Sequence, residues 1–332
     1  MNDKLLYEVA LTLVSGIGDV NGKKLVAYCG GAEAVFREKK KSLSRIPGIG
    51  EKTVDSIMSQ DVLSRAEREL LFAERHGIKI LYYLNLDYPK RLQHCYDSPM
   101  VLYCSGYTDL NVAKIIGVVG TRNVTDYGKL MTDKIISELV DDDVLVVSGL
   151  AYGIDAACHR AAITHGATTV AVVANVLPEV SPAQHRALAD DILRHNGAIV
   201  SELHSQTKQN GKMFISRNRI IAALSMGTVV VESPASGGAL ATADLADGYY
   251  RTVMSVPGRI TDVSSMGSNN LIRTGKARMV LTASDIMDDM DWKPNVQEVA
   301  SEGDSVDERL AALTPLQRRV WDAMSYGAVV DW

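Results

Sequence analysis

Short runs of valine and isoleucine recur along residues 113–286, and helix-forming stretches separate them. Because these runs are almost continuously apolar, each predicts a strand that is covered on both faces, as in a parallel sheet. Strands that alternate with helices in this way predict an α/β fold with a doubly wound, mostly parallel sheet. The predicted strands span residues 115–119, 144–147, 169–173, 198–200, 228–231, 252–256 and 279–281.

The residues before this region are predicted to form a separate helical domain. They contain an internal repeat, because the pattern of Val14–Gly18 (VSGIG) returns at Ile46–Gly50 (IPGIG) and a helix-forming segment follows each copy. A dinucleotide-binding fingerprint would need a preceding strand, and none is predicted here. The pattern instead resembles tandem helix-hairpin-helix (SAM-like) motifs, whose glycine turns can present N–H groups to a DNA phosphate. Such hairpins also serve as packing modules, and the sequence leaves both roles open.

These patterns and the shifts in composition divide the chain into four segments. We expect a helical domain (1–84), a Rossmann-like domain (85–286), an acidic linker (287–308) and the incomplete start of a C-terminal winged-helix domain (309–332). Residues 85–112 form a linking segment with one predicted strand at 100–104, which could add an edge to the sheet. Thr314 and Pro315 suit the cap and first position of the helix expected in the last segment.

The composition limits the kinds of function. The chain has 332 residues, of which 46% are hydrophobic, and a formal net charge of −5. No apolar run approaches the roughly 20 residues needed to cross a bilayer, and the first residues lack a signal-peptide pattern. We therefore expect a cytoplasmic protein without membrane contact. The negative net charge means that any contact with nucleic acid must come from a local basic patch.

Residues that bind metals or cofactors are not grouped in the sequence. The four cysteines contain no C-x-x-C pair, and His185 and His195 lack a partner at metal-ligand spacing. No P-loop occurs, and no G-x-G-x-x-G follows a predicted strand. We therefore expect neither a metal nor a cofactor. His159 is a candidate general base, although a histidine in an alanine-rich helix is more often packed or capping.

The turns after the predicted strands carry the residues that are best suited to bind a ligand. In open α/β sheets, ligands bind at the carboxyl ends of the strands. Arg122 follows the first strand, and Arg259 follows the sixth. Gly149 and Gly153 follow the second strand, where they let the backbone approach a ligand closely. The small residues at 236–238 open a helix and can wrap N–H groups around phosphate oxygens.

The stretch Met213–Ser225 (MFISRNRIIAALS) predicts a helix that begins with positive charge. Ser216 suits the N-cap position, which places Arg217 and Arg219 in the first turn. The helix dipole disfavours each arginine there by about 0.3–1 kcal/mol unless an anion is present. Unpaired N–H groups and guanidinium groups together can hold a phosphate or a carboxylate. The alternative is that both arginines form salt bridges to nearby Asp or Glu side chains.

Together, these motifs resemble the DNA-processing protein A (DprA/Smf) family in order and spacing. The segments that carry the resemblance are Gly117–Arg122 (GVVGTR), Ser148–His159 (SGLAYGIDAACH), Ser201–Glu202, Phe214–Ile221 (FISRNRII), Ser236–Ala243 (SGGALATA), Val256–Gly258 (VPG) and Gly267–Ile272 (GSNNLI). The resemblance implies a DNA-binding protein without catalytic residues. Members bind and protect the incoming single-stranded DNA of natural transformation, dimerise through the Rossmann-like domain, and help to load the RecA recombinase.

The resemblance also implies which residues contact DNA. They are Arg122, Lys212, Phe214, Arg217, Asn218, Arg219, Ser236, Gly237, Gly238 and Thr242. Phe214 matches an aromatic residue that lies beside the strand in the family, and stacking on such a ring is worth about 1–3 kcal/mol per base. The family often has proline after this phenylalanine and a basic residue slightly upstream. Here Ile215 follows Phe214, and Lys212 matches the basic position only approximately.

Two other functions remain open on the sequence. The fold also resembles nucleoside 5′-monophosphate phosphoribohydrolases, in which a glutamate of the motif P-G-G-x-G-T-x-x-E acts on the glycosidic bond. The corresponding turn here ends at Asp244, whose carboxylate is one methylene shorter, and its glycines differ. The second alternative is a protein-interaction scaffold without affinity for DNA, which the negative net charge alone supports.

Overall fold

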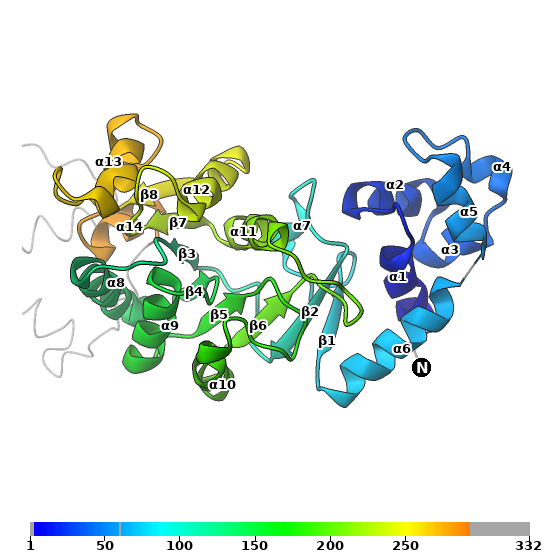
Figure 1. The fold of residues 1–332 in the computed structure, drawn as a ribbon, viewed down its shortest axis with the longest axis horizontal. Helices are drawn as coiled ribbons and strands as arrows, with labels where there is room; N and C mark the ends of the chain where they lie inside the picture. Colours follow the sequence, from blue (N-terminus) through cyan, green and yellow to red (C-terminus); the bar gives the residue numbers. More distant parts are fainter. Residues whose placement is uncertain (1–2, 60, 293–332) are drawn as a thin grey trace, which may run out of the picture. The chain divides into compact units, whose positions relative to one another are not determined.

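The valine- and isoleucine-rich runs form strands of one sheet in the computed structural model, which describes residues 3–59 and 61–292 (Figure 1). Within these residues the strands are β1 (Lys79–Tyr82), β2 (Val101–Gly106), β3 (Ile115–Val119), β4 (Leu145–Ser148), β5 (Thr169–Val172), β6 (Ala198–Ser201), β7 (Gly227–Val230), β8 (Thr252–Ser255) and β9 (Arg278–Met279). Their order across the sheet is β1-β2-β6-β5-β4-β3-β7-β8-β9. Neighbouring strands from β6 to β9 in this order are parallel. The predicted doubly wound α/β sheet is confirmed.

Helices cover both faces of the sheet. In the part of the chain that is described, they are α1 (Asp3–Leu13), α2 (Asp19–Cys29), α3 (Ala32–Arg37), α4 (Lys40–Leu43), α5 (Glu51–Ser59), α6 (Val62–Arg75), α7 (Lys90–Gln93), α8 (Asp126–Leu139), α9 (Ile154–His165), α10 (Arg186–Arg194), α11 (Lys212–Leu224), α12 (Gly238–Gly248), α13 (Met266–Arg273) and α14 (Ala283–Asp289). Figure 1 shows α8 and α9 on one face, and α11 and α12 on the other. Ile135 and Ile154 belong to the core under the first face, and Ile220 and Ala243 belong to the core under the second.

The direction of chain winding changes beside β3. From β3 the chain adds β4, β5 and β6 on one side, and it then returns to add β7, β8 and β9 on the other side. Ile116 of β3 accordingly pairs with Val146 of β4 and with Gly227 of β7. At such a switch point the loops that leave the carboxyl ends of two adjacent strands diverge, and a crevice opens between them. The topology therefore places a ligand crevice beyond the ends of β3 and β7.

The helices α1 to α6 precede the sheet, as predicted. Gly16 and Gly48 occupy the two hairpin turns with φ of +82° and +83°, a backbone region that glycine adopts without strain. The hairpins contact each other, because Lys24 Nζ donates a hydrogen bond to the carbonyl of Pro47 (2.9 Å). Asp19, which follows the first hairpin, accepts a hydrogen bond from the N–H of Met100 (2.9 Å). The first hairpin is thus tied to the segment that leads into β2.

The edges of the sheet differ from the sequence-based expectation. Strand β1 was not predicted, and it pairs antiparallel with β2, which in turn pairs antiparallel with β6. The residues of β1 fall within the segment that was predicted to be helical (1–84), directly after α6. Strand β2, predicted at 100–104, lies between two strands and not at the edge.

The C-terminal part of the sheet domain also extends further than expected. Helix α14 continues past residue 286, where the acidic linker was predicted to begin, and Trp292 is buried. The rest of the linker and the winged-helix start predicted at 309–332 lie outside the described residues. Among the residues that are described, no helix combines the length and the apolar character that crossing a bilayer requires.

We predict that Gly153→Ala destabilises the fold. Gly153 has φ of +79°, and a Cβ at this position would lie 2.1 Å from the carbonyl oxygen of Thr121. Strain and steric clash should together lower the free energy of unfolding by about 2–4 kcal/mol. Gly166→Ala is the matched control, because Gly166 has φ of +87° with no atom within 4 Å of the added Cβ. Its loss should be about 1–2 kcal/mol, from strain alone. Urea unfolding measures both, and equal losses would contradict the role of the close contact.

Candidate functional site

A cavity of about 350 Å³ lies at the carboxyl edge of the sheet, beside the switch point. We call it the rim pocket. Its walls are the loops after β3, β4 and β7, together with α11 and the start of α12. It is lined by Val119, Gly120, Thr121, Arg122, Ala151, Asp155, Phe214, Ile215, Arg217, Asn218, Ile221, Ser233, Pro234, Ser236, Gly237, Gly238, Ala239 and Thr242. Three loops that are far apart in the sequence therefore meet where doubly wound sheets bind ligands.

A cation and an aromatic ring stand at the mouth of the rim pocket. The guanidinium carbon of Arg122 lies 5.7 Å from the centre of the Phe214 ring, within the range of a cation–π contact. Arg122 is exposed, whereas Phe214 is half-buried in the wall. A ligand that enters would meet a positive charge and an apolar ring side by side.

Arg217 forms the floor of the rim pocket. Its side chain is buried, and its guanidinium donates hydrogen bonds to the carbonyls of Gly149 and Val172, at the ends of β4 and β5. Its Nε donates to Oδ1 of Asn218 (3.2 Å). Burial lowers the pKa of Arg217, and the nearby carboxylate of Asp155 opposes this effect. Burial likewise raises the pKa of Asp155, and Arg217 opposes that rise. The floor is thus a buried guanidinium with a carboxyl neighbour.

The turn before α12 supplies backbone N–H groups. Helix α12 starts at Gly238, and its first turn contains no acidic side chain. The first N–H groups of a helix have no partner within the helix, so this end suits an anion. Asn218 Nδ2 donates to the carbonyl of Gly238 (3.3 Å) and links the turn to α11. Thr242 Oγ1 donates to the same carbonyl (3.1 Å), so this hydroxyl supports the turn from within the helix.

The structure brings most of the predicted DNA-binding residues together. Those that line the rim pocket are Arg122, Phe214, Arg217, Asn218, Ser236, Gly237, Gly238 and Thr242. Lys212 and Arg219 do not line it. Lys212 is the first residue of α11, where it is exposed, and its backbone N–H donates to Oδ1 of Asn210 (3.0 Å).

The start of α11 corrects the prediction for its cap. The helix begins at Lys212, and the residue at the cap position is Gly211, not Ser216. The side chain of Asn210 supplies a hydrogen-bond acceptor for the N–H of Lys212, and α11 starts earlier than predicted, by more than one turn. Arg217 and Arg219 consequently lie beyond the first turn, where the positive end of the helix dipole no longer disfavours them.

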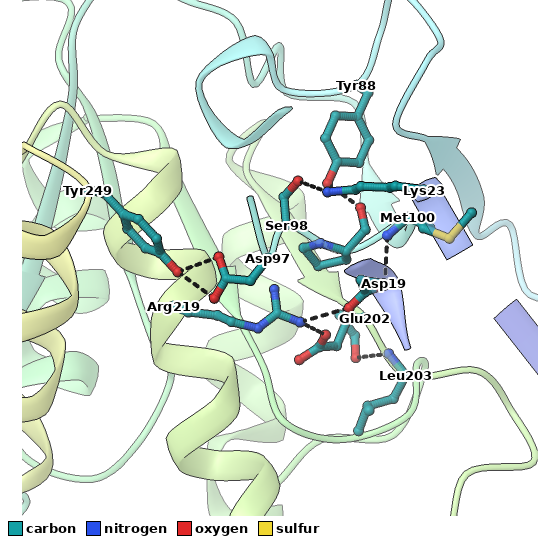
Figure 2. Close-up of polar contacts among 12 residues, drawn as sticks. Asp19, Lys23, Tyr88, Asp97, Ser98, Met100, Glu202, Leu203, Arg219 and Tyr249 are labelled. Carbon is teal, nitrogen blue, oxygen red and sulfur yellow. Dashed lines mark hydrogen bonds and ion pairs between the residues drawn. The ribbon is translucent and has the colours of Figure 1, made fainter. Parts of the chain in front are cut away.

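Arg219 does not line the rim pocket, and its side chain extends to Asp19 of the helical domain (Figure 2). Its Nη2 donates to Oδ2 of Asp19 (3.2 Å) and to Oε2 of Glu202. Successive residues of a helix are about 100° apart, so Arg217 and Arg219 project from nearly opposite sides of α11. Arg219 is thus not brought together with the other predicted DNA-binding residues, and the alternative of salt bridges to acidic side chains holds for this arginine.

Further polar contacts surround Arg219. Tyr249 Oη donates to both carboxylate oxygens of Asp97 (2.7 and 2.9 Å), and Lys23 Nζ donates to Oγ of Ser98 (Figure 2). Burial raises the pKa of Asp19 and of Glu202, and Arg219 opposes the rise in both. Arg219 thus compensates two carboxylates that burial would otherwise disfavour, at the contact between α2 and the sheet domain.

The three histidines that the sequence singled out do not form a reactive site. His159 is fully buried, and its Nδ1 lies 2.7 Å from Oγ1 of Thr169. Burial lowers the pKa of His159 to about 3, and the residue does not line the rim pocket. The ring nitrogens of His185 and His195 lie 2.8 Å from the carbonyls of Leu150 and Asp191. The described residues contain no group of three or more metal-binding side chains.

Acidic residues near both arginines were missed by sequence reasoning. Asp155 lies in the first turn of α9, where acidic residues are common, so nothing in the sequence marks it as the neighbour of Arg217. Asp19 gives no signal either, because its contact depends on how α2 packs. Asp244, which corresponds to the hydrolase glutamate, is exposed, pairs with Lys276 Nζ (3.0 Å) and lies outside the rim pocket.

The fold and the site together define a class of protein: a Rossmann-like domain with a polar crevice at its switch point, preceded by a pair of glycine hairpins. The family model for DNA recombination-mediator protein A matches residues 79–291, and the model for a SAM-like helix-hairpin-helix tandem matches residues 8–60. The chain belongs to the DNA recombination-mediator protein A (DprA/Smf) family, as the sequence motifs predicted.

Individual relatives agree with this assignment. Protein Smf of Synechocystis is 33% identical over 86% of this chain and 72% of its own length. The structure of DNA processing protein A from Streptococcus pneumoniae aligns with a TM-score of 0.74 at 28% identity, over 85% of this chain and 97% of that one. DNA processing protein A from Helicobacter pylori aligns with a TM-score of 0.58 at 27% identity, over 64% and 95%, and its structure concerns single-stranded DNA binding by that protein.

We predict that His159 makes the protein less stable in acid. Its pKa is about 3 in the folded chain, against an ordinary value of 6.5. As the pH falls below about 6.5, His159 is therefore protonated in the unfolded chain but stays neutral in the folded chain. Over this range the free energy of unfolding decreases by at most about 1.4 kcal/mol per pH unit. In His159→Gln this contribution is absent, so the stability gap between wild type and variant should change between pH 6.5 and 4. Parallel curves of stability against pH would contradict it.

We predict that Arg219→Ala destabilises the contact between α2 and the sheet domain. The variant removes the cation that pairs with both Asp19 and Glu202, and both side chains are mostly buried. The free energy of unfolding should fall by about 2 kcal/mol, which is less than for a fully buried pair because some solvent reaches this one. Arg194→Ala is the control, because Arg194 pairs with Asp191 at an exposed site. It should cost at most about 1 kcal/mol. Similar losses in urea unfolding would argue against the structural role of Arg219.

Proposed function

We propose that this chain binds single-stranded DNA at the rim pocket. The observation that carries the proposal is the pairing of Arg122 with Phe214 beside the N–H groups of the Gly237–Gly238 turn. An isolated phosphate or carboxylate needs no aromatic ring, whereas a single strand offers both a phosphate and an unpaired base. Stacking on Phe214 would tolerate any base, because every base has a π-face.

The proposal gives the lining residues different roles. Arg122 and the N–H groups of the turn at 236–238 would hold a phosphate, and Phe214 would stack with a base. Arg217 and Asn218 would make few contacts with the DNA, since the hydrogen bonds of both already join the loops of the pocket. These two residues would therefore keep the pocket in shape.

At the level of the cell, we propose a recombination mediator of natural transformation. It would protect incoming single strands, work as a homodimer through its Rossmann-like domain in the cytoplasm, and help to load the RecA recombinase. Membership of the family supports this proposal, and so does the name of the H. pylori structure, which describes single-stranded DNA binding by that relative. A site that contacts phosphate and one base face suits a mediator, because it must accept strands of any sequence.

We predict that Arg122→Ala and Phe214→Ala weaken the binding of labelled oligothymidylate. Loss of one stacked base, worth about 1–3 kcal/mol, corresponds to roughly a 5-fold to 150-fold loss of affinity for Phe214→Ala. Arg122→Ala should also reduce the slope of log K against log salt by about 0.7, because one phosphate contact is lost. Fluorescence anisotropy measures both quantities. Duplex DNA should bind more weakly than the single strand.

Lys129→Ala is the control for these variants. Lys129 is an exposed cation on α8 that pairs with Asp126 (3.0 Å) and lies outside the rim pocket. Its removal should leave the affinity unchanged. Arg217 and Arg219 are unsuitable for this test, because both have structural contacts whose loss would perturb the fold. Unchanged affinity in both pocket variants would refute the proposal.

A further inference from the structure

We infer that a second cavity next to the rim pocket holds the neighbouring nucleotides of the same DNA strand. The inference rests on the proposed function and extends it to a longer binding track. This cavity has a volume of about 1210 Å³ and lies between the loop after β3 and the loop after β8. We call it the loop cavity.

The loop cavity continues directly from the rim pocket. Thr121 and Pro234 line both cavities, so the loops after β3 and β7 form the divide between them. Both cavities therefore lie along the carboxyl edge of the sheet, one at the switch point and the other toward β8. A DNA strand that is anchored in the rim pocket would have to continue past one wall of this pocket. The loop cavity provides open space beside the wall that the two cavities share.

The side chains in the loop cavity suit a single strand without selecting a sequence. Arg259 is exposed on the loop after β8 and can meet a phosphate. The ring of Tyr127 is partly exposed, and Asn123 adds an amide on the loop after β3. An aromatic ring, a guanidinium and an amide around an open groove match the requirements for binding single strands by stacking and charge.

The loop after β8 is held in place in the described structure. Tyr127 Oη donates to the carbonyl of Pro257 (2.6 Å). Asn269 makes two hydrogen bonds with the backbone of Gly258, which are 2.9 and 3.0 Å long. The N–H of Gly267 donates to the carbonyl of Ser233 (2.8 Å), which joins the start of α13 to the loop after β7. A ligand would therefore meet a pre-formed wall, and binding would not have to order it.

One acidic side chain faces the same cavity and provides a second test. Asp262 lines the loop cavity close to Arg259. Its carboxylate would repel a phosphate that passes over the loop, so its neutralisation should strengthen binding there. A second carboxylate near the cavity, that of Glu232, is buried and accepts hydrogen bonds from the N–H and hydroxyl of Thr125 (3.0 and 2.7 Å). Its charge is thus already compensated by hydrogen bonds.

The test compares oligothymidylates of increasing length, from about 3 to about 20 nucleotides, by fluorescence anisotropy on the full chain. Arg259→Ala should weaken the binding of the long oligonucleotides by about 3-fold to 10-fold and reduce the salt slope by about 0.7. Asp262→Asn should strengthen the binding of the same oligonucleotides by about 2-fold to 3-fold. Neither change should affect the shortest oligonucleotide, which fills the rim pocket alone. Arg68→Ala, on α6, is the matched control and should change nothing.

Three other outcomes would contradict the role of the loop cavity. If Arg259→Ala and Asp262→Asn leave the affinity unchanged at every length, the loop cavity does not carry the strand. If Arg259→Ala weakens the shortest oligonucleotide as much as the longest, the two cavities are one site and not successive stretches. If thymidine monophosphate competes with the long oligonucleotide, and if this competition is lost in Arg259→Ala, the loop cavity is a site for a free nucleotide and not for the DNA strand. The variants Arg122→Ala and Phe214→Ala decide the proposed function separately.

Discussion

The buried guanidinium of Arg217 joins segments that the fold brings to one edge of the sheet. Its hydrogen bonds reach the ends of β4 and β5, while α11 carries its backbone and Asn218 continues the contact to the turn before α12. A shorter or neutral side chain would leave the carbonyls of Gly149 and Val172 without these donors, and each such loss costs about 1–3 kcal/mol. The walls of the rim pocket therefore keep their spacing because one side chain bridges them.

The sheet and the position of the site were predictable because both follow from local patterns and a topological rule. Near-continuous valine and isoleucine runs, such as that of β3, identify buried parallel strands, and alternation with helices fixes their direction. Once the strands run parallel, all their carboxyl ends meet at one edge, so the loops with Arg122 and with Gly237 had to converge. Strand β1 escaped prediction because Lys79–Tyr82 falls within the segment that was predicted to be helical, and its pairing with β2 was therefore missed.

The roles of the two arginines on α11 could not be read from the sequence. In the segment Arg217-Asn218-Arg219, the two arginines carry the same charge, and they are about 200° apart around the helix. This angle shows that their side chains lie on opposite sides of the helix, but it does not show which of them faces the ligand. That assignment depends on the rotation of α11 against the sheet. The rotation is set by the buried residues Ile220 and Leu224, which pack against the sheet, and by Asp19 and Glu202 on the other side. Information of this kind exists only in the tertiary structure.

Because Arg217 and Arg219 are two residues apart, α11 is shared between the rim pocket and the contact with the helical domain. Asp19 belongs to a hairpin module, whereas Arg219 belongs to the sheet domain, and an ion pair joins the two. A chain that exchanged its hairpin module for one without an acid at this position would keep the pair between Arg219 and Glu202 but lose the one that reaches the hairpins. A substitution that shifts or rotates α11 should therefore disturb the hairpin contact and the rim pocket together.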